Sequence, residues 1–190
     1  MRGFNIYKTD RDARGGGVLL AVHKNIPSTQ LHIVSNYEVV ACTVFFKNFK
    51  INICNVYFPN HVNITLNEIN NLFNSIPDPK IVLGDVNAKH ISWGSPTNCS
   101  RGITLANSLL TNDLLVLNNG EPTRYDKFTN MFSHIDVTSC STALGTKLDW
   151  SIMDDTNGSD HFPILIFFDF EQQYSKRNSI VVKLKCNGNV

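Results

Sequence analysis

The fold prediction depends on the stretch Lys80-Ile81-Val82-Leu83-Gly84-Asp85-Val86-Asn87-Ala88. It begins as a short apolar strand, which leads directly into an acid and an amide two residues apart. Side chains alternate along a strand, so Asp85 and Asn87 point the same way. A carboxylate at this place can orient or deprotonate a water molecule, and an amide can hold a phosphate oxygen or that water. A plain turn is the alternative interpretation of this motif.

Short predicted strands and two predicted helices surround this stretch. Apolar residues recur at helical spacing in residues 66–76 and 101–112, and Ser100 or its neighbour is a candidate N-cap for the second helix. The predicted strands comprise residues 18–22, 37–46, 51–57, 80–83, 114–117, 132–138, the surroundings of Trp150, and 164–168. Helices interleaved with many strands predict an α/β fold in which two sheets pack face to face with helices outside.

The composition favours one domain. The 190 residues are 42% hydrophobic and 17% charged, which supports a sizeable buried core. We assign residues 1–170 to this domain and the polar residues 171–190 to a linker or tail. The net charge of +1 does not indicate a nucleic-acid binder, although a local basic patch is enough to contact phosphates.

The cysteines and apolar runs indicate the cellular setting. The five cysteines are scattered, and none forms a CxxC pair, so we do not expect zinc. We infer a reducing, intracellular compartment. No apolar run reaches membrane-spanning length, so we expect no membrane partner.

Two further motifs place polar residues beside predicted strands. The first, Ser133-His134-Ile135-Asp136-Val137-Thr138, puts Asp136 in an apolar alternating strand, where an unpartnered carboxylate is costly to bury. The second, Ser159-Asp160-His161-Phe162-Pro163, offers a hard oxygen ligand suited to Mg²⁺ or Mn²⁺ in Asp160, and an imidazole that titrates near neutral pH in His161. We expect Asp136 to pair with His161, because a carboxylate fixes the tautomer and orientation of an imidazole. A surface strand with Asp136 in solvent is the alternative.

These motifs and several others follow one another in an order that resembles the endonuclease domains of insect-type non-LTR retrotransposons, within the endonuclease/exonuclease/phosphatase superfamily. The remaining elements of the series are Gly15-Gly16-Gly17-Val18, Val56-Tyr57-Phe58-Pro59, Trp93-Gly94, Arg101-Gly102 and Pro122-Thr123. The series extends from about residue 11 to residue 168. The resemblance implies a four-layer, deoxyribonuclease-like α/β sandwich.

The resemblance also implies an activity and its partners. The family hydrolyses a DNA phosphodiester with Mg²⁺ or Mn²⁺, and the nick exposes a 3′ hydroxyl that primes reverse transcription. The implied partners are DNA and the reverse transcriptase domain of the same element, and the implied location is the nucleus when the domain acts on DNA.

Five residues receive catalytic roles from the resemblance. Asp85 would orient or deprotonate the attacking water, and Asn87 would hold the phosphate or that water. Tyr57 would contact the scissile phosphate. His161, paired with Asp136, would stabilise charge on the phosphate, and either His161 or Asp85 would be the general base.

Other residues receive metal-binding or substrate-binding roles. Asp160 would bind the metal directly or through water. Thr123 would contact DNA or phosphate, and Ser159 would bind substrate or support its loop. Arg11 and Arg101 would meet phosphates or lie in solvent.

One expected part of the family pattern is missing. The resemblance implies an opening strand-helix-strand unit that carries an Asn and the Glu that is the principal metal ligand. About fourteen residues precede Gly15, and none of them is Glu; the first, Glu38, lies in a later predicted strand. We therefore expect the sandwich to lack this unit, and this polypeptide alone to have reduced nuclease activity or none.

Two other functions remain open. One is a phosphatase or lipid phosphodiesterase of the same superfamily, against which Trp93-Gly94 and Arg101-Gly102 argue. The other is a non-catalytic remnant or DNA-binding module that kept the scaffold and lost the metal.

Overall fold

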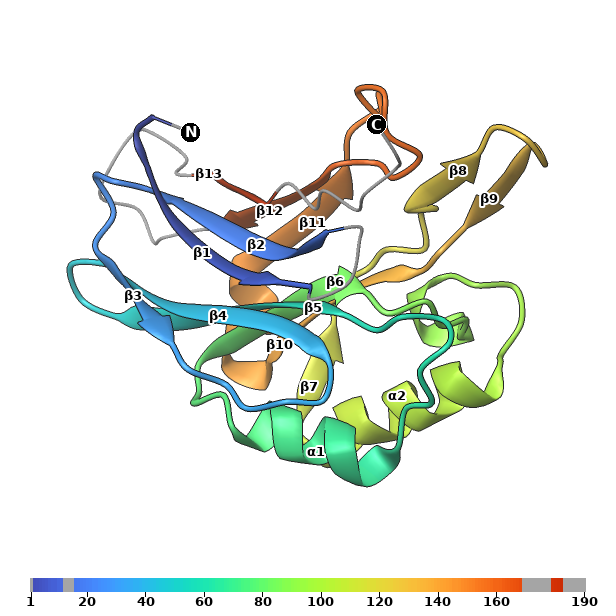
Figure 1. Ribbon diagram of the computed structural model, residues 1–190, viewed down its shortest axis with the longest axis horizontal. Coiled ribbons are helices and arrows are strands. Elements are labelled where there is room, and N and C mark those ends of the chain that lie inside the picture. Colours follow the sequence, from blue (N-terminus) through green and yellow to red (C-terminus); the bar gives the residue numbers. More distant parts are fainter. Residues whose placement is uncertain (1, 12–15, 169–178, 183–190) are drawn as a thin grey trace.

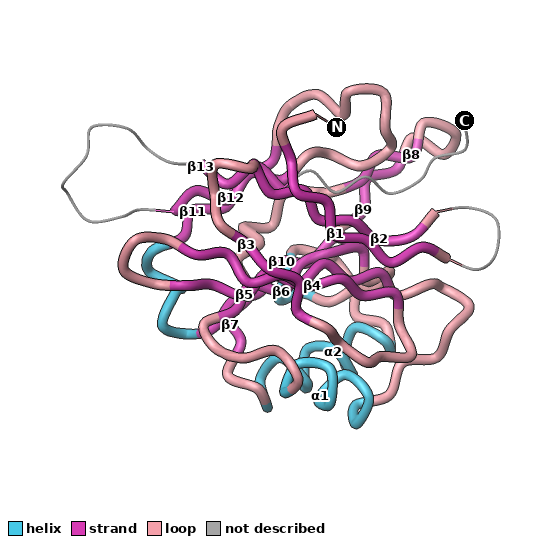
Figure 2. Tube along the Cα trace, turned by 60° about the vertical axis from the view of Figure 1, so that its left-hand side comes forward, coloured by secondary structure: helices cyan, strands magenta, loops and turns pink. Residues whose placement is uncertain are grey.

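A computed structural model describes residues 2–11, 16–168 and 179–182 of the chain. Figure 1 shows both α-helices below a central sheet and shorter sheets above it. Figure 2 shows the same helices on one side of the strands only. The predicted α/β sandwich is confirmed, and the described residues form a helix layer, a sheet layer and a layer of smaller sheets.

The central sheet has six strands in the order β3-β4-β5-β6-β10-β7. Their bounds are β3 (Ser28–Leu31), β4 (Glu38–Phe45), β5 (Lys50–Tyr57), β6 (Lys80–Asp85), β10 (Asp136–Ser141) and β7 (Leu114–Val116). Only β5 and β6 are parallel neighbours, and α1 (Leu66–Asn74) lies in the connection between them, as a parallel pair requires. Because layers cover both faces of the sheet, β5 and β6 are buried almost throughout.

The helices pack on one face of this sheet. Thr65 caps α1 by accepting from the backbone N–H of Glu68, and Cys99 caps α2 (Ser100–Thr111) in the same way through its sulfur. The apolar side chains that face the sheet from the two helices are Ile69, Leu72, Phe73, Leu105 and Leu109. The helical periodicity thus predicted both helices correctly, and the first ends two residues earlier than expected.

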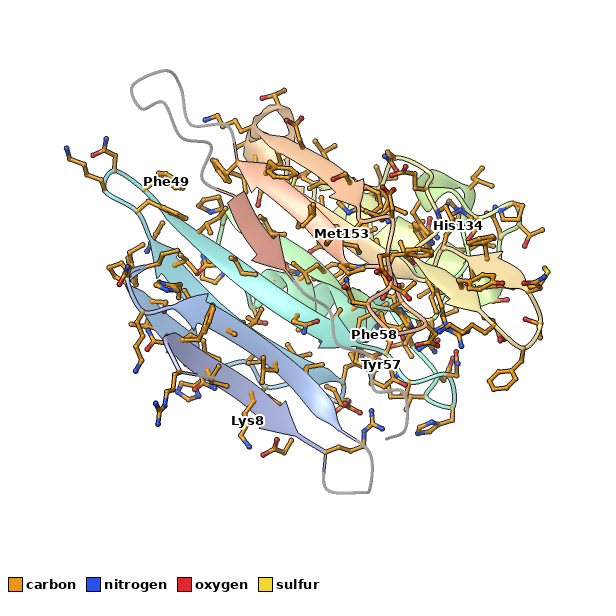
Figure 3. The ribbon with its side chains drawn as sticks, turned by 90° about the horizontal axis from the view of Figure 1, so that it is seen from above. Lys8, Phe49, Tyr57, Phe58, His134 and Met153 are labelled. Carbon is orange, nitrogen blue, oxygen red and sulfur yellow. The ribbon has the colours of Figure 1, made fainter. Side chains whose placement is uncertain are left out.

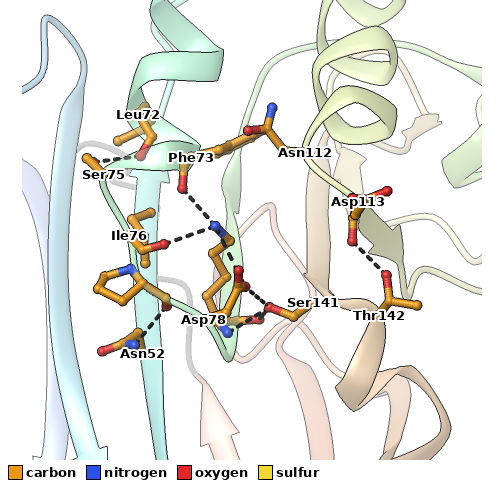
Figure 4. Close-up of polar contacts among 12 residues, drawn as sticks. Asn52, Leu72, Phe73, Ser75, Ile76, Asp78, Asn112, Asp113, Ser141 and Thr142 are labelled. Carbon is orange, nitrogen blue, oxygen red and sulfur yellow. Dashed lines mark hydrogen bonds and ion pairs between the residues drawn. The ribbon is translucent and has the colours of Figure 1, made fainter.

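The buried Lys80 closes the end of α1 (Figure 4). Its ammonium donates to the backbone carbonyls of Phe73 at 2.8 Å and Ile76 at 2.9 Å. A cation at this end satisfies carbonyls that have no partner within the helix and matches the helix dipole. Lys80 therefore couples the first residue of β6 to the helix that precedes it.

Two smaller sheets cover the opposite face of the central sheet. One pairs β1 (Phe4–Asp10) with β2 (Gly17–His23), and the other has β11 (Leu148–Ile152), β12 (Ile164–Phe168) and β13 (Ser179–Val182). Apolar side chains from both contribute to one core with the central sheet, among them Leu20 and Trp150. This second core lies between the sheet layers, and the first lies beneath the helices.

The structure divides one predicted strand. Residues 132–138 form the end of β9 (Met131–Ser133) and the beginning of β10, because the chain leaves one sheet and enters another at residues 134–135. Strand β9 pairs with β8 (Arg124–Asp126) in a hairpin that extends away from the layers (Figure 1). Strands β1, β3 and β8 were not predicted, because their polar residues do not produce a clear apolar pattern.

The structure describes only residues 179–182 of the predicted tail. Most of residues 171–190 lie outside the described residues, and Ser179–Val182 pairs with β12. The four described cysteines are free thiols, and Cys186 lies outside the described part. In that described part, we find no helix with the length and apolar character needed to span a bilayer.

Candidate active site

Four polar residues form a row across the central sheet. Glu38 on β4 pairs with Tyr57 on β5, and Tyr57 pairs with Asp85 on β6. Asp85 pairs in turn with Asp136 on β10. Directly paired residues of neighbouring strands point to the same face, so the strand register alone gathers these side chains. The row lies on the face that the smaller sheets cover, at the end where β5 and β6 both finish.

Gly84 allows the strands to approach closely beside this row. Its φ is +148°, and a Cβ atom at this position would lie 1.9 Å from the carbonyl oxygen of Val56. Any other residue would push β6 away from β5. The glycine in the Gly84-Asp85 motif therefore has a packing role next to the acid.

The loop before β12 places His161 over the end of the row. His161 Nδ1 lies 2.8 Å from Asp136 Oδ2, and both side chains are buried. Backbone hydrogen bonds from the Tyr125 N–H to the Asp160 carbonyl and from the Phe162 N–H to the Thr123 carbonyl attach this loop to β8 and to the residue before it. The structure thus brings together the histidine and the carboxylate that we expected to pair.

The row crowds like charges into a buried space. Burial and the neighbouring charge of Asp136 raise the pKa of Asp85 to about 7. Burial lowers the pKa of His161, but the hydrogen bond to Asp136 and the negative charges of Asp136, Asp85 and Asp160 together outweigh burial and raise the pKa above its usual value. Near neutral pH, the imidazole is therefore more often protonated, and the Asp85 carboxyl less often ionised, than either group is in water.

The site fits a divalent cation. Ligand atoms of Asp85, Asp136 and His161 all lie within 4.8 Å of one another. The Oδ1 atom of Asp136 is buried and has no hydrogen-bond partner. A buried carboxylate oxygen without a partner is costly, and carboxylate oxygens are preferred ligands of Mg²⁺ and Mn²⁺. A cation would supply the missing partner and offset the repulsion between the two acids.

Asp160, the predicted metal ligand, lies outside this cluster. Its carboxylate accepts a hydrogen bond of 2.8 Å from Arg124 Nε, and this ion pair is about one-third exposed. The sequence reasoning missed Arg124, although it directly follows the Pro122-Thr123 element. Asp160 as a ligand stays a prediction, and in this structure its Oδ2 atom is paired with Arg124.

Asn87 is held close to Asp85. Its backbone N–H donates to Asp85 Oδ1 at 3.0 Å, and its side-chain amide donates to the Phe58 carbonyl at 3.2 Å. The backbone of Asn87 has a φ of +48°, a left-handed conformation that asparagine tolerates better than most residues. The turn that the motif suggested is thus real. Strand β6 ends at Asp85, so strand alternation does not orient the Asn87 side chain, and it is the backbone N–H of Asn87 that contacts the acid.

Tyr57 occupies the row between Glu38 and Asp85, at the end of β5 (Figure 3). Burial, and then the charge of Asp85, raise the pKa of the Tyr57 hydroxyl. The Arg11 guanidinium lies 5.2 Å from the Tyr57 ring centroid and pairs with Glu38 through two hydrogen bonds of 2.7 and 3.0 Å. Glu38 thus belongs to the site's surroundings, which the sequence did not reveal, and Arg11, expected to meet phosphates or to lie in solvent, pairs with it here.

Thr123 and Ser159 face inward. Thr123 is completely buried, and its hydroxyl accepts from the backbone N–H groups of Ile135 and Asp136. The Ser159 hydroxyl accepts from the backbone N–H of His161. Their positions support the two partners of the His161–Asp136 pair, and Thr123 lies behind Asp136, away from the surface.

Comparison with known proteins identifies the family. A family model described as endonuclease-reverse transcriptase matches residues 51–165. The chain belongs to this family. It is 33% identical over 115 residues to a probable RNA-directed DNA polymerase from transposon X-element of Drosophila melanogaster, covering 60% of this chain and 13% of that protein. It is 27% identical over 165 residues to the RNA-directed DNA polymerase from mobile element jockey of the same species, covering 85% of this chain and 18% of that protein.

Solved structures agree with this assignment to the endonuclease-reverse transcriptase family. The endonuclease domain of TRAS1, a telomere-specific non-LTR retrotransposon, superposes with a TM-score of 0.79 at 25% identity, covering 90% of this chain and 81% of that domain. An endonuclease/exonuclease/phosphatase family protein from Bacteroides thetaiotaomicron superposes with a TM-score of 0.54 at 13% identity, covering 93% and 78%. The second likeness shows the fold alone. The resemblance seen in the motifs is confirmed.

Proposed function

We propose that this chain is the metal-dependent DNA endonuclease domain of a non-LTR retrotransposon. The observation that carries the proposal is the buried cluster of Asp85, Asp136 and His161, in which one Asp136 oxygen lacks a partner. Membership of the endonuclease-reverse transcriptase family and the likeness to the TRAS1 domain support it. The reaction is hydrolysis of a phosphodiester bond in one strand of the DNA, which leaves a 3′ hydroxyl at the nick.

The chain's own residues divide the work of this reaction. Asp85 orients the attacking water and Asn87 holds the phosphate beside it, because a backbone hydrogen bond joins Asn87 to the Asp85 carboxylate in the turn after β6. Tyr57 contacts the scissile phosphate. His161 directs Nδ1 to Asp136, which leaves Nε2 for a phosphate oxygen, where an imidazolium offsets developing charge. The general base is either Asp85, with His161 an imidazolium from the start, or His161, which then begins as the neutral imidazole and becomes the imidazolium by taking the proton of the water.

The cation has a limited place in this scheme. The oxygens of Asp85 and Asp136 would hold it, and it would offset charge on the phosphate and leaving oxygens. Two carboxylates form a weak site for Mg²⁺, which usually keeps several waters and needs help from substrate phosphates. We therefore expect slow nicking by this polypeptide alone, even at millimolar metal.

Nicking of supercoiled plasmid tests the proposed function. We expect conversion to the open circle with Mg²⁺ or Mn²⁺, none with a chelator, and none for Asp85→Asn or His161→Ala. Asp149→Asn is the matched control, because this exposed aspartate lies on β11 outside the row. Nicking that persists in chelator, or that Asp85→Asn leaves unchanged, contradicts the proposal.

Two further assays identify product and substrate. Extension of the nicked plasmid by a DNA polymerase requires a 3′ hydroxyl, so lack of extension contradicts the proposed product. Release of phosphate from phosphoinositides in place of plasmid nicking would indicate a lipid phosphodiesterase or phosphatase. Salt-dependent DNA binding without cleavage would indicate a binding module.

The partners in the cell follow from the relatives. The chain spans 13% and 18% of the X-element and jockey proteins, which are named RNA-directed DNA polymerases. We propose that the domain acts on DNA in the nucleus, together with a reverse transcriptase domain of the same element. Primer extension by that domain from the nick is the corresponding test.

A further inference from the structure

Arg101 in the first turn of α2 donates only to backbone carbonyls in the hydrogen bonds of the described residues. Its Nε donates to Val86 at 3.0 Å, and Nη1 donates to Val62 at 2.6 Å. Its Nη2 donates to Phe58 at 2.8 Å and to Pro59 at 3.1 Å. The sequence suggested that Arg101 meets phosphate or lies in solvent. The structure instead uses all three guanidinium nitrogens inside the molecule.

These carbonyls belong to the two loops that carry the row's central residues. Phe58 and Pro59 directly follow Tyr57, and Val86 lies between Asp85 and Asn87. The Phe58 carbonyl also accepts from the side-chain amide of Asn87, so Arg101 and Asn87 share one acceptor. A single guanidinium thus connects the loop after β5 with the loop after β6.

The start of α2 is itself attached to the second loop. The Cys99 N–H donates to the Lys89 carbonyl at 3.0 Å, and the Cys99 sulfur accepts from the Lys89 N–H. At Gly102, a Cβ atom would lie 1.9 Å from the Lys89 carbonyl oxygen, so the helix rests directly on this segment. The backbone from which Arg101 extends is therefore held in place beside both loops.

We propose that Arg101 is a positioning residue that sets Tyr57 and Asn87 relative to Asp85. This inference rests on the proposed nuclease function. A planar guanidinium has five donors in a fixed fork, whereas a lysine ammonium has three donors at one point and cannot reach both loops. Small displacements of positioning groups reduce catalytic rates by up to about 100-fold.

The kinetic experiment uses Arg101→Lys in the plasmid-nicking assay. We expect the turnover rate to fall by about 100-fold, with KM for DNA nearly unchanged, because Arg101 does not touch the substrate. Adding methylguanidinium to Arg101→Ala should restore part of the rate. The control is Leu109→Ala, a core truncation on the same helix that should lower stability and retain the rate at temperatures where it is folded.

A second measurement separates this inference from the proposed function. Amide hydrogen exchange can be measured whether or not the chain is active. In Arg101→Lys we expect faster exchange in residues 58–62 and 86–89 than in the parent, and an unchanged exchange rate in α1. If the parent chain does not nick DNA, only the proposed function fails, and exchange decides the role of Arg101. Unchanged exchange, an unchanged nicking rate in Arg101→Lys, or an equal rate loss in Leu109→Ala overturns the inference.

Discussion

The two ends of β6 carry buried charged side chains in opposite circumstances. At the start, the Lys80 ammonium donates to two carbonyls and lies 3.7 Å from Asp78 (Figure 4). At the end, Asp85 accepts from the Asn87 N–H and lies beside Asp136, whose Oδ1 has no partner. One end is electrostatically satisfied and supports the fold. The other keeps an unmet demand for positive charge, which is the property of a site that binds a cation and a phosphate.

The largest expected effect is on activity. Asp85→Asn removes the charge that orients water and attracts the cation, so plasmid nicking should fall by about 1,000-fold or more. Asparagine retains an oxygen that accepts from the Asn87 N–H, so the fold should persist. A rate loss of less than tenfold, which is about 1.4 kcal/mol of activation free energy, would mean that Asp85 is not catalytic. The two ends of β6 would then not differ in function.

The same substitution should stabilise the protein in a pH-dependent way. The pKa of Asp85 is raised from its ordinary 3.8 to about 7 in the folded state. The folded state therefore holds this proton to higher pH, and the associated stability is full below about pH 4 and is lost as pH rises through 7. In chelator, Asp85→Asn should thus gain up to about 4 kcal/mol over the parent by pH 8.

Urea unfolding of both proteins between pH 4 and pH 8 provides the measurement. The difference in unfolding free energy between variant and parent reports Asp85 together with its charge interaction with His161, because the Asp85 charge also raises the pKa of that imidazole. The stability advantage of Asp85→Asn over the parent should grow from pH 4 to pH 8. An advantage that shrinks as pH rises would contradict a raised pKa of Asp85.

At the other end, Lys80→Met should destabilise the protein. The substitution removes the ammonium donor from the carbonyls of Phe73 and Ile76, of which Phe73 keeps a hydrogen bond of 3.3 Å from the Ile76 N–H, and a hydrogen bond to a charged group contributes about 2 kcal/mol. Urea unfolding at neutral pH should show the loss, with the exposed Lys147→Met as the matched control. The nicking rate of the folded fraction should stay unchanged. A fall in that rate would mean that Lys80, at the start of β6, also contributes to catalysis.

The smallest expected effect is stabilisation by metal. A cation at about ten times its dissociation constant stabilises the folded state by about 1.4 kcal/mol, which corresponds to about 3–6 °C in Tm for a domain of this size. Thermal unfolding with Mn²⁺ should show this shift in the parent and in Lys80→Met, and not in Asp85→Asn. An equal shift in all three would place the cation elsewhere.

Much of the fold could be predicted because local patterns decide it. The apolar stripes of the two helices and the runs that become β4, β5, β6 and β12 have the periodicities of their elements. The polar strands β1 and β3 could not be predicted, because their own residues lack a clear apolar pattern and each is ordered by pairing with the more apolar strand that follows it. The break between β9 and β10 likewise depends on Thr123, which holds the chain where it changes sheets.

The family, the apolar strand that leads into Gly84-Asp85-Val86-Asn87, and the need of Asp136 for a partner could all be inferred from the sequence. Those conclusions rest on residue order, periodicity and the cost of burying a charge, which are local properties. The atoms that meet could be known only from the folded chain, because register aligns Glu38 with Tyr57 across β4 and β5, and packing turns Arg101 inward to backbone carbonyls. Loop closure likewise directs the Asp160 carboxylate to Arg124, because contacts between distant segments depend on how layers stack.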